Sequence, residues 1–159
     1  PSKRDLVLIS AGIYPLHFHN QLQQPRTRDR GLAIYLDVSG SVNEYLSNIV
    51  GILSHLKREI TSVFLFSNRV AEVSFQSLLQ GNVKTTYGTD FDCVAKSILE
   101  RGFDKAIVIT DGYAAMESAL QEQLKQHGLS SLTILFDKAQ TCEVFAEFGE
   151  VVLLEDVCE

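Results

Sequence analysis

The chain has 159 residues, of which 45% are hydrophobic and 21% charged, and these values are typical of one globular domain with a full core. The formal net charge of -6 argues against a general binder of nucleic-acid backbones, which needs an excess of Lys and Arg. The chain contains no run of about 18 apolar residues, so the sequence predicts a soluble protein without a transmembrane helix.

Residues 1–30 are interpreted as an N-terminal extension of the main domain. The stretches "DLVLIS" and "YPLHFHN" have the composition of strands, and we expect extra strands or a hairpin there. The basic residues in "PRTRDR" are interpreted as part of a solvated linker. His17 and His19 would face the same side of an extended strand, which leaves zinc binding open as an alternative, although no third ligand is evident nearby.

Residues 31–159 are predicted to form one α/β domain, because short β-branched runs alternate with longer stretches of helical periodicity. We expect a doubly wound, mostly parallel, Rossmann-like sheet with one short antiparallel edge strand and helices on both faces. Strands are predicted at 32–37, 61–67, 70–75 (the edge strand), 105–110, 132–136 and 150–155. Helices are predicted at 43–58, 91–101, 115–127 and 139–148, with Gly102, Gly128 and Gly149 as helix stops.

The cysteines Cys93, Cys142 and Cys158 are odd in number and widely spaced, without a CxxC pair. This pattern predicts neither a disulfide framework nor a zinc knuckle. A reducing compartment, and hence a cytoplasmic location, is therefore expected.

Polar residues follow or precede the predicted elements at three places along the domain. In open α/β sheets ligands bind beyond the carboxyl ends of the strands, so we expect these places to converge. Hydroxyls and carboxylates without imidazole or thiolate are ligands for Mg²⁺, Mn²⁺ or Ca²⁺ rather than for zinc or copper. The residues concerned are Asp37, Ser39 and Ser41 after the first strand, Thr89, Asp90 and Asp92 around the start of the helix at 91, and Asp111 in "VITDG".

The order of the motifs "DVSGS", "GTDF" and "VITDG" resembles the signature of von Willebrand factor A (vWA) domains over roughly residues 31–155. The resemblance implies a metal-ion-dependent adhesion site (MIDAS). In such a site Ser39, Ser41 and Thr89 would bind a divalent cation, Mg²⁺ above all, directly or nearly so. Asp37 and Asp111 would act largely through water. Family members often carry a second glycine where this chain has Tyr87, which suggests a less mobile loop.

The stretch from Gly88 to Gly112 is similar to bacterial, intracellular vWA-like domains of metallopeptidase-like proteins. The resemblance implies a non-enzymatic module whose cation is completed by an Asp or Glu of a protein partner, in some relatives beside an associated ATPase. Membrane binding is not expected, and nucleic-acid binding is disfavoured by the charge.

Several other interpretations stay open at this stage. Ser39, Ser41, Asp90 and Asp111 are residue types that cap helices, and Asp92 suits the first turn of one. A metal-dependent hydrolase with Asp37 or Asp111 as base or nucleophile is the main functional alternative, and a binder of phosphate or nucleic-acid ends is another. The chain has no HExxH, GxSxG, GxGxxG or GxxxxGK[ST] motif that would specify a peptidase, serine hydrolase or nucleotide site.

Overall fold

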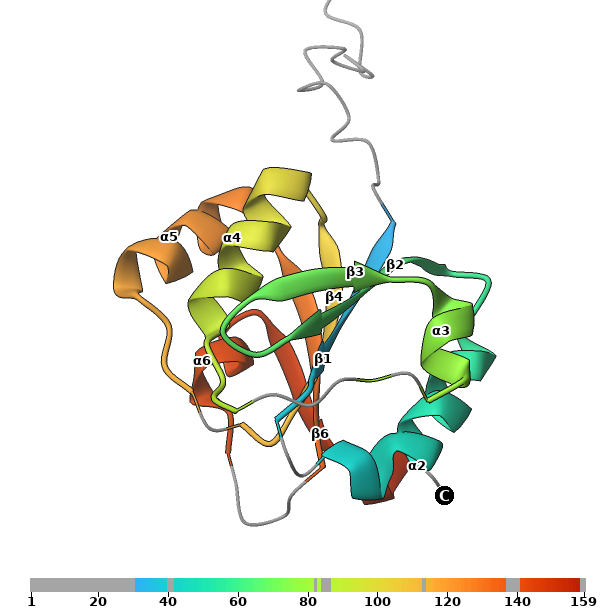
Figure 1. Cartoon of the computed structure of the whole chain (residues 1–159). Coiled ribbons are helices and arrows are strands. Elements are labelled where there is room, and N and C mark those ends of the chain that lie inside the picture. The colour runs from blue at the N-terminus through green and yellow to red at the C-terminus, as the bar shows by residue number, and fades with distance from the viewer. Residues whose placement is uncertain are drawn as a thin grey trace, which may run out of the picture.

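A mostly parallel sheet lies at the centre of the protein, as a computed structural model shows for residues 31–39, 42–81, 83, 87–112, 114–136 and 141–157 (Figure 1). In this described part the sheet has six strands in the order β3-β2-β1-β4-β5-β6. β3 is antiparallel to β2, and the other pairs are parallel. The strands are β1 (Leu32–Asp37), β2 (Ile60–Phe66), β3 (Val70–Val73), β4 (Lys105–Thr110), β5 (Ser130–Leu135) and β6 (Gly149–Leu153).

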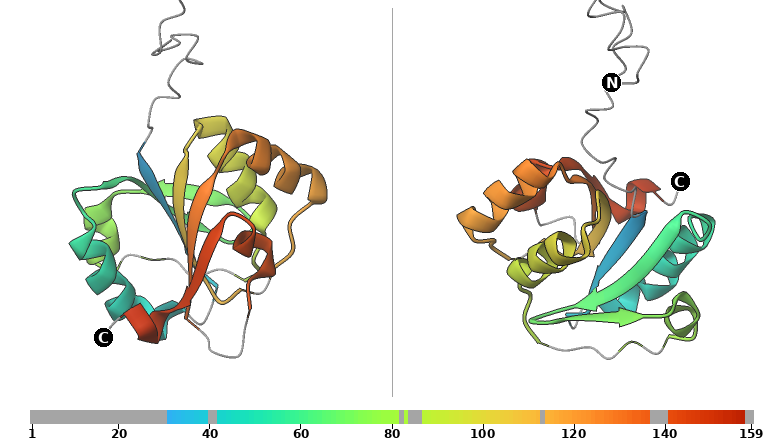
Figure 2. Two further views of the ribbon diagram at one scale, coloured as in Figure 1. Left: turned by 180° about the vertical axis from the view of Figure 1, so that it is seen from behind. Right: turned by 90° about the horizontal axis from the view of Figure 1, so that it is seen from above.

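Helices cover both faces of this sheet, which confirms the predicted doubly wound α/β class (Figure 2). One face carries α4 (Phe91–Arg101), α5 (Ser118–His127) and α6 (Glu143–Ala146). The other face carries α2 (Val42–His55), the short α3 (Phe75–Leu79) and the short α7 (Leu154–Val157).

The central strand β1 supplies both cores by the alternation of its side chains. Ala33 and Tyr35 are buried in the core beneath α4 and α5, whereas Ile34 and Leu36 are buried in the core beneath α2. A strand covered on both faces reads as a continuous apolar run, as "LAIYLD" does. The strand ends at Asp37, its first charged residue, and every side chain from Ala33 to Asp37 is buried.

Several element boundaries differ from those predicted, and local hydrogen bonds explain the clearest cases. α5 begins at Ser118 rather than at residue 115, because the amide of Glu117 donates to Asp92 Oδ1 (2.7 Å) and Glu117 becomes the N-cap. β3 ends at Val73 because Ser74 caps the unpredicted α3, its Oγ accepting the amide of Ser77 at 3.1 Å. α2 ends at His55, α6 covers only Glu143–Ala146 of the predicted helix, and α7 was not predicted. The expected hairpin in residues 1–30 lies outside the described residues.

Gly102 and Gly128 end α4 and α5 in the left-handed conformation, as predicted, but the role assigned to Gly149 was wrong. α6 ends at Ala146 with Glu147 as its C-cap, and Gly149 is the first residue of β6. A Cβ atom at Gly149 would overlap the carbonyl oxygen of Ser131 on β5. Close approach of two strands, rather than a helix stop, therefore requires this glycine.

Substitution of Gly149 and of Gly51 is expected to change stability in opposite directions. Gly149→Ala should lower the free energy of unfolding by about 1–3 kcal/mol, because the strands must separate to admit the methyl group. Gly51 lies within α2, where alanine has the higher helix propensity, and a Cβ there would meet no atom within 4 Å, so Gly51→Ala should raise that free energy by about 0.5–1 kcal/mol. Urea unfolding of both variants measures the two effects, and equal stability of Gly149→Ala and the unmodified protein would contradict the close-approach explanation.

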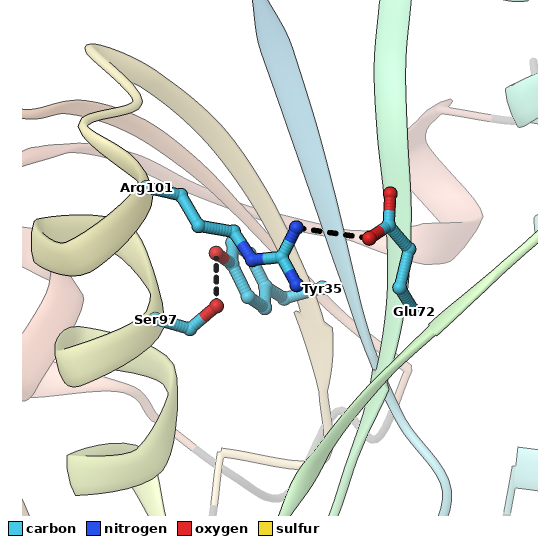
Figure 3. Close-up of polar contacts among 4 residues, drawn as sticks. All are labelled: Tyr35, Glu72, Ser97 and Arg101. Carbon is cyan, nitrogen blue, oxygen red and sulfur yellow. Dashed lines mark hydrogen bonds and ion pairs between the residues drawn. The ribbon is translucent and has the colours of Figure 1, made fainter.

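A buried hydrogen bond joins α4 to the central strand, beside a surface ion pair (Figure 3). The hydroxyls of Tyr35 and Ser97 lie 3.0 Å apart, and burial raises the pKa of Tyr35 to about 12, so the phenol stays neutral. Nearby, the guanidinium of Arg101 lies 4.8 Å from the ring centroid of Phe64 and donates to Glu72 at 2.9 Å. The side chains of Arg101 and Glu72 are each 47% exposed, so the ion pair contributes little compared with the buried bond.

Removal of one partner from each contact tests whether the buried hydrogen bond contributes more to stability than the surface ion pair. Ser97→Ala leaves the buried Tyr35 hydroxyl unpaired and should cost about 1–3 kcal/mol of unfolding free energy. Glu72→Gln is the matched surface change, and it should cost less than about 1 kcal/mol. Chemical denaturation of both variants gives the comparison, and a larger loss for Glu72→Gln would reverse our assignment.

Candidate metal centre

The predicted site lies where the connections from two neighbouring strands diverge to opposite faces of the sheet. β1 leads into α2 on one face, whereas its neighbour β4 leads towards α5 on the other. Doubly wound sheets form a crevice beyond the carboxyl ends of the strands at such a position. Asp37 ends β1 and Thr110 ends β4, so both lie where the topology predicts this crevice.

Asp37 is the centre of the polar contacts at this position, and it is completely buried. Its Oδ1 accepts a hydrogen bond from the backbone amide of Ser39 at 2.9 Å. Its Oδ2 accepts from the hydroxyl of Thr110 at 2.7 Å and from the hydroxyl of Thr89 at 3.2 Å. Three segments of the chain thus direct neutral donors at one carboxylate.

The environment of Asp37 raises the pKa of its carboxyl group above the ordinary value of 3.8. Burial is the largest cause, and the negative charge of Asp111 raises the pKa further. The hydrogen bonds from the Ser39 amide and the Thr110 hydroxyl oppose this effect without cancelling it. The ionised carboxylate is therefore held in a place where a nearby positive charge would stabilise it.

Ser39 presents a buried hydroxyl that lacks a hydrogen-bond partner among the described residues. Its proximity to Asp37 lowers the pKa of that carboxyl slightly, but the two groups form no hydrogen bond of normal geometry. The amide of Val42, the first residue of α2, donates to the backbone carbonyl of Ser39 at 3.1 Å rather than to its side chain. A buried polar atom without a partner carries a cost, and a bound ligand would remove it.

The turn before α4 brings Thr89 to Asp37. The amide of Asp90 donates to the carbonyl of Ser67 at 2.9 Å, which ties this turn to the end of β2. Gly88 adopts φ 88°, and a Cβ atom there would lie 2.8 Å from Asn68 Oδ1. The preceding residue, Tyr87, is 94% exposed. Gly88 is thus required by the backbone conformation, whereas the exposed Asn68 side chain could move aside.

The structure brings four of the five predicted ligands to one end of the sheet, and Ser41 lies outside the described residues. Asp37, Ser39 and Thr89 are adjacent, and Asp111 lies close enough for its charge to act on Asp37. The sequence interpretation missed Thr110, whose hydroxyl also accepts from the amide of Gly112 at 3.1 Å. Thr110 could have been identified from its position as the last residue of β4, the strand next to β1.

The helix-capping alternatives have separate outcomes for the individual residues. Asp90 is the N-cap of α4, with its carboxylate accepting the amide of Asp92 at 2.9 Å. Asp92 lies in the first turn of α4, as predicted. Asp111 does not cap α5, because Glu117 occupies that position. The Ser39 side chain caps no helix among the described residues.

The donors at this crevice fit a hard cation better than a transition metal. No group of three or more His, Cys, Asp or Glu side chains that could hold a metal ion occurs in the described part of the chain. A cation here would instead be coordinated by hydroxyl oxygens, with carboxylates nearby. Mg²⁺ binds oxygen ligands of these kinds. His55 and His127 lie elsewhere on α2 and α5, and His17 and His19 lie outside the described residues.

The described cysteines show no features of a catalytic or redox site. Cys93 and Cys142 are free thiols. Cys93 Sγ donates to the carbonyl of Asp90 at 2.9 Å, and burial raises its pKa to about 11. Burial also raises the pKa of Cys142. Both thiols are therefore protonated at neutral pH and poor nucleophiles.

Comparison with known proteins leaves the family unassigned. No protein-family model matches the chain, and no curated protein is detectably similar to it. Membership of the vWA family therefore stays a prediction from the motif order. In the described residues no helix has the length and apolar character needed to cross a membrane.

Asp37→Asn is expected to stabilise the cation-free protein at neutral pH. The amide keeps an acceptor for the Ser39 N–H, Thr110 Oγ1 can accept as well as donate, and the cost of the buried charge disappears. We expect a gain on the order of 1 kcal/mol in unfolding free energy, as at other sites where function costs stability.

The pH dependence of that gain follows from the raised pKa of Asp37. The gain is present above the folded-state pKa, shrinks as the pH falls through it, and is lost below the ordinary value of 3.8. Thermal unfolding of both proteins in chelator, at pH 7 and across the acid range, measures the difference. A variant that is less stable at pH 7 would show that Asp37 is a structural residue.

Proposed function

We propose that this domain binds a divalent cation, Mg²⁺ in the first place, and uses it to bind an acidic residue of a protein partner. Ser39, Ser41 and Thr89 would hold the cation, with Asp37 and Asp111 completing its surroundings. The observation that carries the proposal is the buried Ser39 hydroxyl without a described partner, next to a buried carboxylate bonded by neutral donors.

Electrostatics support a cation rather than an anion at this crevice. Asp37 and Asp111 repel one another, which contributes to the raised pKa of Asp37. A phosphate group placed there would add a third negative charge to the pair. The charges therefore disfavour the alternative of a phosphate or nucleic-acid end binder unless a cation is already present.

The use of hydroxyl ligands explains why a partner carboxylate would be attracted. Serine and threonine hydroxyls are neutral, and Asp37 is already engaged by three donors, so the protein neutralises the cation incompletely. When bound, the cation supplies a positive charge and a coordination position for an acidic ligand. Protein residues around the crevice would then orient the partner.

Tyr87 is suited to such an orienting contact. It stands two residues before Thr89, and its side chain is 94% exposed. Exposed aromatic side chains give large contact areas at a low entropic cost, and they are frequent in the energetic centres of interfaces. We propose that a partner packs on Tyr87 while its carboxylate approaches the cation.

The hydrolase alternative gains no specific support from the geometry. A base or nucleophile must reach a substrate, whereas Asp37 is fully buried and accepts hydrogen bonds on both oxygens. We therefore propose a non-enzymatic role. The free thiols of Cys93 and Cys142 agree with a cytoplasmic setting, where an associated ATPase is one expected partner.

Calorimetric titration of Mg²⁺ and Mn²⁺ into chelator-treated protein tests the proposal. Ser39→Ala should weaken cation binding by at least about tenfold while leaving the fold intact, because its hydroxyl has no described partner to lose. Ser54→Ala is the matched control, since Ser54 is an exposed serine on α2 away from the crevice. Its cation affinity should equal that of the unmodified protein.

The partner role is tested with the cation-loaded protein and an Asp-containing peptide library. Selected peptides should bind with Mg²⁺ and be released by chelator, and Tyr87→Ala should weaken peptide binding without changing cation affinity. Absence of heat at millimolar cation, or equal titrations for Ser39→Ala and Ser54→Ala, would refute the metal centre. Cation binding with turnover of phosphate or peptide esters would favour the hydrolase instead.

A further inference from the structure

An apolar groove lies on the face of the sheet that carries α2, away from the candidate metal centre. Its volume is about 670 Å³. One wall is the second half of α2, and the floor is formed by β4 and β5. The apolar lining residues are Ile52, Leu53, Leu56, Ile107, Leu132 and Ile134.

The two faces of the sheet are covered unequally in the described part of the chain. α4, α5 and α6 pack over one face (Figure 2). On the other face α2 has 14 residues, whereas α3 and α7 have five and four. Parallel strands are normally buried on both faces, yet Leu132 and Val152 on β5 and β6 are only partly buried towards the α2 side. The groove thus lies on the less covered face of the sheet in the described residues.

We propose that residues 6–18 of this same chain bind in the groove. This segment, "LVLISAGIYPLHF", contains the apolar residues Leu6, Val7, Leu8, Ile9, Ile13, Tyr14, Leu16 and Phe18 and no charged residue. Exposure of so much apolar surface to water would be unfavourable, at about 25 cal/mol per Å². The uncharged segment matches the uncharged apolar floor of the groove.

The position at which the chain enters β1 allows this docking. Leu32 pairs with Lys105, two residues before Ile107 of the groove floor, and Leu32 packs on the α2 side. β5 lies two strands from β1, which is about 10 Å. The 13 residues from 19 to 31 can span at most about 45 Å, at about 3.5 Å per residue. The segment can therefore reach every residue of the groove.

Tethering favours this segment over a second copy of the protein. A segment joined to the domain by a short stretch of the same chain binds intramolecularly, at an effective concentration in the millimolar range. A second copy at micromolar concentration would need an affinity about a thousandfold higher to compete. We therefore assign the groove to the protein's own N-terminal segment.

Hydrogen–deuterium exchange of the complete chain tests this assignment. Amides within residues 6–18 should exchange at least about tenfold more slowly than in a synthetic peptide of the same sequence. Ile52→Asp places a charge in the groove and should abolish this protection. Ser54→Asp, on the same helix but absent from the groove lining, should preserve it.

A second variant keeps the test valid if Ile52→Asp fails to fold. Leu8→Asp combined with Leu16→Asp alters the segment alone, and it should speed amide exchange in residues 47–56 of α2. Unprotected residues 6–18 in the unmodified chain would overturn the proposal. Protection that survives Ile52→Asp in a folded protein would overturn it too, and so would protection that disappears on dilution together with a sedimenting dimer.

Discussion

The burial of one carboxylate at the end of the central strand is the constraint on which the site depends. β1 lies between β2 and β4 and is covered by helices on both faces, and the Asp37 side chain at its end is fully buried. An ionised group in this position must be surrounded by donors, and the protein supplies them from the loop after β1, the turn before α4 and the end of β4. The positions of Thr89 and Thr110 follow from this requirement.

The donors around Asp37 are neutral, and this distinguishes the crevice from a structural ion pair. A Lys or Arg beside Asp37 would lower the pKa of the carboxyl group and satisfy it permanently. Instead burial and Asp111 raise that pKa, and the Ser39 hydroxyl has no described partner. Such an arrangement leaves the negative charge without a fixed positive partner among the groups that act on it, as the proposed binding of a cation would require. Functional sites commonly cost stability.

The sequence predicted the fold class, because it depends on simple periodicity, and the structure places Asp37, Ser39 and Thr89 together at one end of the sheet. Continuous apolar runs such as "KAIVIT" identify doubly covered strands, and polar residues just after such strands must meet at one edge. Thr110 was missed because the last residue of a strand reads as part of the strand. Gly149 was misassigned because a glycine near a helix end suggests a cap, whereas the clash with Ser131 arises from pairing with a distant segment. Short helices such as α3 and α7 were not predicted, because four or five residues are too few to show the hydrophobic periodicity of a helix.

The hydrogen bonds to Asp37 also join residues that are far apart along the chain. Thr89 is 52 residues and Thr110 is 73 residues from Asp37 in sequence. Neither donor can reach the carboxylate until β1 has been joined by β4 and the turn before α4 has been tied to β2. A partly folded chain, or one still emerging during synthesis, would therefore present separate serine, threonine and aspartate side chains with no common centre. Assembly of this crevice therefore requires β1, β2 and β4 to be in place, and the partner binding proposed above would depend on the same long-range pairing.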